Sequence, residues 1–178
     1  MPTPLSDQYL IDYSGEHLLH EINMFWKLSE TIQPNEIGFL PSVLIESFAI
    51  HLRNLIEFFY FPPESKYVRA REFFDDPNGW KPTMTNPVKA ALTRANEEVS
   101  HLTHGRKSGM PPDKTWDPVG LLKEIEPVAR DFAIRASIKK LHANVRELFK
   151  LPSNELRVWL DKNATYSNVA SGTITYSV

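Results

Sequence analysis

PSVLIESFAIHLRNLIEFFY, residues Pro41 to Tyr60, is the stretch of the sequence that decides the fold. Its apolar residues recur at steps of three and four, which is the period of an α-helix. They are Leu44, Phe48, Leu52, Leu55 and Phe59. Pro41 suits the first turn of a helix, because its missing N–H would have no partner there. Since apolar residues cover much of its circumference, we expect this helix to be buried on several sides, at the centre of an all-α bundle.

Three polar side chains, His51, Arg53 and Asn54, interrupt this apolar helix near or inside the expected core. An unpaired polar group in a core costs on the order of a few kcal/mol, so we expect all three to have partners. Arg53 has Glu57 one turn on and Glu46 two turns back, so an internal ion-pair network accounts for it without an active site. The sequence favours this structural role over a binding role.

The composition bounds the class of protein. At 178 residues we expect one helical-bundle domain over residues 1–162, followed by a flexible or extended tail over residues 163–178. The net charge of −2 gives no overall sign of nucleic-acid or membrane binding, and the absence of cysteine excludes disulfides and thiolate metal sites. The N-terminus has no signal pattern, and no window approaches the roughly 18 apolar residues that span a bilayer. We therefore expect a cytoplasmic protein without membrane partners.

The remaining helical patterns predict a helical bundle of four to five main helices with short extra helices. The first long helix should cover residues 5–32, with Ser14-Gly15 as an interruption, because glycine inside a helix costs roughly 1 kcal/mol relative to alanine. Two histidines and two glutamates on this helix are typical of a solvated face. They are His17, His20, Glu16 and Glu21.

The second half of the chain contains two more long helical patterns, over residues 87–105 and 117–150, and a short one over 153–161. Pro127 must kink or divide the longest of them. Residues 61–86 form a connection longer than a compact domain normally leaves without structure. We expect a short helix in it that carries two phenylalanines onto the core, and a tryptophan that holds the connection to the body. These residues are Phe73, Phe74 and Trp80.

Arg94 and His101 lie seven residues apart, almost two helical turns, so they share one helix face. Glu98 falls between them and can pair with Arg94. Such a face suits metal-independent RNA cleavage, in which a histidine moves protons and an arginine balances the charge on the phosphate. A solvated face with one ordinary ion pair is the alternative, which the spacing alone favours. If this helix packs beside the 41–60 helix, the polar residues of both can share one groove.

The same helix also carries residues of types that bind metals. Glu98-x-x-His101 has the spacing used in di-iron bundles, but such sites need this motif twice and it occurs once. His101 and His104 can chelate a metal, but a third ligand is not evident. The sequence also contains no P-loop, dinucleotide-binding glycine pattern or nucleophile elbow. We therefore expect neither a metal nor a cofactor.

The chain resembles the HEPN superfamily of small all-α bundles, which is marked by Arg, four to six residues, then His. Arg94 and His101 have six residues between them, whereas Arg53-Asn54 has no histidine at positions 58 to 60. The resemblance covers residues 40–150. It implies a homodimer in which two Arg/His pairs face a shared cleft, and a toxin or defence RNase that acts on RNA and has a cognate antitoxin.

In this interpretation Arg94 and His101 are the catalytic residues, with His101 as acid and base. The residues assigned to binding are His51, Arg53, Asn54, Glu98 and His104. The alternative is a noncatalytic helical-bundle protein that binds a protein partner or a nucleotide.

Overall fold

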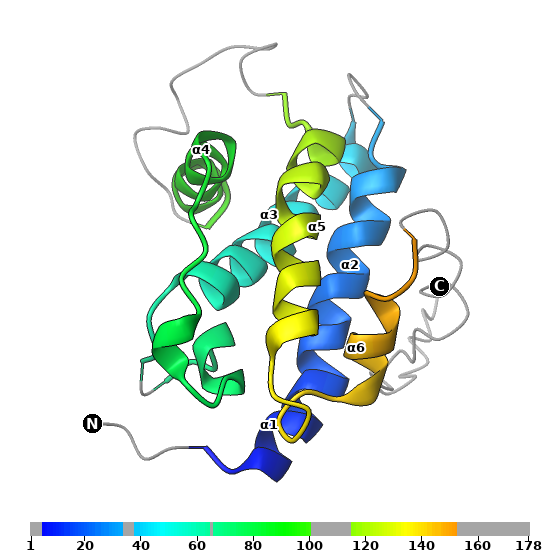
Figure 1. Ribbon diagram of the computed structural model, residues 1–178. Helices are drawn as coiled ribbons and strands as arrows, with labels where there is room; N and C mark the ends of the chain where they lie inside the picture. The colour runs from blue at the N-terminus through cyan, green and yellow to red at the C-terminus, as the bar shows by residue number, and fades with distance from the viewer. Residues whose placement is uncertain (1–4, 34–37, 65, 101–114, 153–178) are drawn as a thin grey trace, which may run out of the picture.

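The computed structural model describes residues 5–33, 38–64, 66–100 and 115–152 (Figure 1). The regular elements of these ranges are helices, apart from one isolated bridge between Glu64 and Tyr67. The predicted all-α helical bundle is confirmed. In chain order the elements are α1 (Asp7–Tyr13), η1 (Ser14–Leu18), α2 (Leu19–Thr31), α3 (Phe39–Tyr60), η2 (Ala70–Phe73), η3 (Pro77–Gly79), α4 (Asn86–Arg94), η4 (Ala95–Ser100), α5 (Pro118–Arg135) and α6 (Ala143–Leu148).

The helix α3 organises the bundle, because it packs against α2, α4, η4 and α5. Figure 1 shows α2 and α5 running side by side, with α3 crossing behind α5. Helix α4 lies on the side of α5 that faces away from α2. The burial of α3 corrects in part the prediction that this helix is buried on several sides. Residues from Phe48 onward reach the core, but Phe39 is 87% exposed and Leu40 is 64% exposed. Leu44 and Ile45 of the first two turns are only partly buried against the core, so α3 is buried on several sides only from Phe48 onward.

The exposed start of α3 bears on a second prediction. By length and composition alone, α3 is the one helix of the described ranges that passes the test for spanning a membrane, with a mean hydropathy of 1.2. The statement that no window approaches this limit was therefore wrong. The core helix of a soluble protein passes the same test, so the finding is weak evidence for a membrane.

The expected interruption at Ser14-Gly15 is present, as a π-helical turn between α1 and α2. Its cause is tertiary contact. A Cβ on Gly15 would lie 2.7 Å from the ring carbon Cδ2 of His142, so only glycine permits this approach. The buried Ser14 accepts a hydrogen bond at its Oγ from the backbone N–H of His142, at 3.0 Å. The turn thereby joins the first helix to the start of α6.

An aromatic cluster around Phe132 of α5 forms the centre of the core. Its ring contacts five others, at centroid distances of 5.4 to 6.0 Å. They are Phe58, Phe59, Phe73, Phe74 and Trp80. The indole Nε1–H of Trp80 donates to the backbone oxygen of Phe59 at 2.8 Å. The prediction that residues 61–86 are held to the core by these side chains is confirmed, although their helix is a short 3-10 turn.

The last long helix breaks at a different place from the one predicted. Helix α5 continues through Pro127, and the chain leaves it only after Arg135. Pro127 lies on the exposed face, so the carbonyl that loses its partner belongs to the exposed residue Lys123. At the true break, the guanidinium of Arg146 donates to the carbonyls of Ala133 and Ala136, at 2.9 and 3.0 Å. The predicted helix over 153–161, the helix end near residue 105 and the 163–178 tail lie outside the described residues.

Tyr60, at the end of α3, carries a buried hydroxyl without a hydrogen-bond partner in the described ranges. Burial, with a smaller contribution from the charge of Glu124, raises the pKa of Tyr60 to about 12. We expect Tyr60→Phe to raise the free energy of unfolding by about 1 kcal/mol at neutral pH, because it removes an unpaired polar group. Urea denaturation measures this difference, and a loss of stability in the variant would contradict it.

The same variant has an expected pH dependence. The ordinary pKa of tyrosine is 10.0, so above pH 10 the unfolded chain releases the Tyr60 proton before the folded chain does. Folding stability therefore falls as the pH rises from 10 towards 12. Tyr60→Phe should lack this part of the fall, so its advantage over the wild type should grow in urea titrations above pH 10.

Candidate functional site

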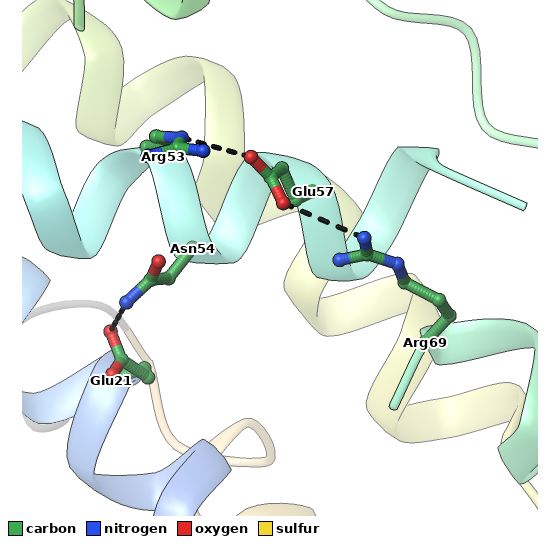
Figure 2. Close-up of polar contacts among 5 residues, drawn as sticks. All are labelled: Glu21, Arg53, Asn54, Glu57 and Arg69. Carbon is green, nitrogen blue, oxygen red and sulfur yellow. Dashed lines mark hydrogen bonds and ion pairs between the residues drawn. The ribbon is translucent and has the colours of Figure 1, made fainter. Parts of the chain in front are cut away.

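Two polar residues of α3, His51 and Asn54, contact Glu21 of α2. Glu21 Oε2 lies 2.7 Å from Nδ1 of His51. It also accepts a hydrogen bond from the Asn54 side-chain amide at 3.2 Å, which Figure 2 shows. The His20 ring meets the His51 ring edge-on, with centroids 5.6 Å apart. The expectation that His51 and Asn54 are paired is confirmed, but Asn54 is exposed rather than buried. The prediction that Glu21 belongs to a solvated face was wrong, because that face of α2 lies against α3.

Arg53 pairs with Glu57, as predicted, and a second arginine completes the group. Arg53 Nε lies 2.9 Å from Glu57 Oε1, and Arg69 Nη2 lies 3.5 Å from Glu57 Oε2. Figure 2 shows the Glu57 carboxylate between the two guanidinium groups. The side chain of Arg53 is 34% exposed, that of Glu57 18% and that of Arg69 5%. We call Arg53, Glu57 and Arg69 the arginine triad; its buried cation is Arg69, not Arg53.

Arg69 is enclosed by aromatic rings and is poorly supplied with acceptors. Its Cζ lies 4.6 Å from the centre of the Tyr67 ring and 5.6 Å from that of Phe61. Its buried Nε has no hydrogen-bond partner among the described residues. Its backbone N–H donates to Glu72 Oε2 at 2.7 Å. Burial raises the pKa of Glu72, and this hydrogen bond opposes the rise.

A cavity of about 580 Å³, here called the polar cavity, opens beside the arginine triad. One wall comes from α1 and η1, one from Arg53 to Phe58 of α3, and one from Lys66 to Arg69. On the first wall, three aromatic side chains follow one another at four-residue steps: Tyr9, Tyr13 and His17. We call them the aromatic wall. The Tyr9 and Tyr13 rings stack at a centroid distance of 6.2 Å, and those of Tyr13 and His17 lie 5.2 Å apart.

Arg94 lines a different cavity, of about 300 Å³, together with Trp116. Its Cζ lies 4.3 Å from the centre of the Trp116 ring, and its Nη1 donates to the Thr115 carbonyl at 3.1 Å. Asn54 thus lines the polar cavity and Arg94 lines this second one. The predicted groove shared with His101 stays a prediction, because His101 lies outside the described residues.

His101 and His104 lie outside the described residues, and the structure does not describe the side chain of Glu98. The catalytic and binding roles assigned to these residues and to Arg94 therefore stay predictions.

No protein-family model, curated protein or solved structure matches this chain. The HEPN resemblance therefore stays a prediction, and the site has to be interpreted from its own chemistry.

The described ranges contain no group of three or more His, Asp or Glu side chains that could hold a metal ion. This finding does not cover His101 and His104, which lie outside the described ranges. In the polar cavity the charges of the arginine triad sum to +1, because two guanidinium groups share one carboxylate. Lys66 adds a further positive charge at the exposed edge. The one other carboxylate on its walls, Glu21, is already engaged by His51 and Asn54.

The sequence did not assign Glu21, Lys66, Arg69 or the tyrosines of the cavity to a site. Glu21 lies 30 residues before His51, and no local spacing indicates that contact. Arg69 lies in the irregular connection after α3, where periodicity gives no guide. One local signal was available for the aromatic wall, because residues 9, 13 and 17 share one helix face.

Proposed function

We propose that this chain is a noncatalytic helical-bundle protein that binds a small organic anion in the polar cavity. The proposal rests on the burial of the Arg69 guanidinium with few hydrogen-bond acceptors. The side chain of Arg69 is 5% exposed, and its one acceptor among the described residues, Glu57 Oε2, stands at 3.5 Å. A buried cation with unused donors is costly to the folded chain unless an acceptor reaches it. An anion in the polar cavity would be that acceptor.

The electrostatics of the cavity support the same ligand class. Three cations, Arg53, Lys66 and Arg69, stand on its walls against two carboxylates, Glu21 and Glu57, so the local charge is positive and favours an anion. Guanidinium groups bind carboxylate and phosphate oxygens through paired N–H donors, which also fixes the orientation of the bound group. Fixed charges hold an anion without moving a proton, so the proposal concerns binding alone.

Metal-independent RNA cleavage by Arg94 and His101 stays a prediction, as do a homodimer, an RNA substrate, a cognate antitoxin and a cytoplasmic location. The charge and the lining of the polar cavity support the binding alternative.

Arg69→Gln tests the proposal. An NMR titration of the full chain at low salt, with inorganic phosphate and with ribose 5-phosphate, should shift resonances around the polar cavity. We expect Arg69→Gln to weaken this binding at least about 10-fold, since a hydrogen bond to a charged group contributes about 1.5–3 kcal/mol.

Arg71→Gln is the matched control, because Arg71 lies two residues further on and is not among the residues that line the cavity. It should bind both anions like the wild type. Should Arg69→Gln not fold, Arg53→Gln replaces a cation of the same cavity that is 34% exposed. No shift with either anion, or equal binding by the Arg69 and Arg71 variants, would overturn the proposed function.

A further inference from the structure

Binding of a simple anion does not require the aromatic wall of the polar cavity. Tyr9, Tyr13 and His17 all line the polar cavity, and each ring follows the previous one by a helical turn. Tyr9 is 49% exposed, so much of its ring is left uncovered by the rest of the chain. Burial, followed by the charge of Glu21, raises the pKa of Tyr13. Partly uncovered aromatic rings on a cavity wall are surfaces on which a flat group can stack.

The charged end of the cavity carries a further aromatic ring. Tyr67 is 51% exposed, and its ring lies 4.6 Å from the Arg69 guanidinium carbon. Arg69 and Tyr67 thus place a cation and an aromatic ring side by side in the lining that the aromatic wall also shares. One ligand can therefore meet positive charge and aromatic rings at the same time.

The size of the cavity points in the same direction. About 580 Å³ lies within the range of roughly 300–1,000 Å³ that is typical of small-molecule sites. An isolated phosphate would leave most of this space unfilled. Two arginines and a lysine lie on the walls with two carboxylates, Glu21 and Glu57, so the lining keeps a net positive charge that suits an anionic group such as a phosphate.

We propose that the ligand of the polar cavity is an organic phosphate that carries a planar aromatic ring. Its phosphate lies at Arg69, Arg53 and Lys66, and its ring stacks on the aromatic wall. Phenyl phosphate is the smallest member of this class, and a nucleoside monophosphate is a larger one. This inference rests on the proposed function, because it names the chemical class of the anion bound at that site.

The experiment compares matched pairs of phosphates on the full chain by calorimetry and NMR titration at low salt. Phenyl phosphate is paired with cyclohexyl phosphate, which has nearly the same size but no π system. Adenosine 5′-monophosphate is paired with ribose 5-phosphate, which lacks the base. We expect the aromatic member of each pair to bind at least about 10-fold more tightly.

Tyr9 supplies the variant. Tyr9→Leu should reduce the advantage of the aromatic phosphates over their nonaromatic partners, and it should leave the affinity for the nonaromatic phosphates unchanged. Tyr9→Phe keeps the ring and should bind like the wild type. Because Tyr9 is half exposed, neither change should unfold the protein.

Failure of this inference can be told from failure of the proposed function. If both members of each pair bind equally and Arg69→Gln still weakens them, anion binding stands and the aromatic class is wrong. If adenosine binds as tightly as its monophosphate, the anion-binding role of Arg69 is wrong. If none of the four phosphates binds, both proposals are overturned.

Discussion

Phe132→Ala should lower the free energy of unfolding by about 3–5 kcal/mol, the largest stability effect we expect from a single change. Phe132 is fully buried and contacts five other aromatic rings, contributed by α3 and by the connection after it. Its removal leaves a cavity where these segments meet, and rigid rings cannot collapse to fill it. Chemical denaturation should show the loss, together with a fall in melting temperature of roughly 10 °C.

Ile134→Ala is the matched control on the same helix. Ile134 is 71% exposed, so truncating it should change stability by less than about 0.5 kcal/mol. A loss for Phe132→Ala that is no larger than the loss for Ile134→Ala would show that the aromatic cluster is not the centre of the core. Tryptophan fluorescence offers a second measurement of the packing in the cluster, because the ring of Trp80 stacks on Phe74 and touches Phe132.

Glu57→Ala should lower the free energy of unfolding by about 3 kcal/mol. The change leaves the Arg69 guanidinium, in a side chain that is 5% exposed, without its acceptor in the described ranges. Removing one partner of a buried ion pair costs about 3–5 kcal/mol, and the lower end applies because Glu57 keeps 18% of its side chain exposed. Arg53→Ala removes the other, 34% exposed partner of Glu57 and should cost less than about 1 kcal/mol.

A double variant separates the cost of an uncompensated charge from the value of the pair itself. Glu57→Ala combined with Arg69→Met removes both charges and keeps an apolar stem in place. Because a buried ion pair can be replaced by apolar groups at little cost, we expect the double variant to be more stable than Glu57→Ala alone. If the second substitution adds a further loss, the Arg69 charge is satisfied by something other than Glu57.

The helices themselves could be predicted closely from the sequence. The central helix, expected over residues 41–60, runs from Phe39 to Tyr60, and Arg53 pairs with Glu57 one turn on. The interruption at Ser14-Gly15 was also predicted, but for the wrong reason, since glycine is required there by the approach of His142. The predicted break at Pro127 does not occur, because this proline lies on a solvated face where losing one backbone hydrogen bond costs little. The break after Arg135 was not predicted.

The candidate site was predicted only in part. Arg53 and Asn54 lie in the polar cavity, and Arg94 lies beside Trp116. His101 lies outside the described residues, so the Arg94/His101 pair on which RNA cleavage depends stays a prediction. The buried cation, Arg69, was not considered. It belongs to an irregular segment, and the sequence around it contains no period or motif that indicates burial.

The sequence by itself determined that the chain is an all-α bundle, where its central helix lies, and which phenylalanines and tryptophan hold the connection after it to the core. These features follow from helical period and side-chain hydrophobicity, which act between near neighbours. Only the tertiary structure decided that Glu21 meets His51 and Asn54, and that Arg69 shares Glu57 with Arg53. Those contacts depend on how helices and an irregular segment cross in space, and no local spacing in the chain encodes that geometry.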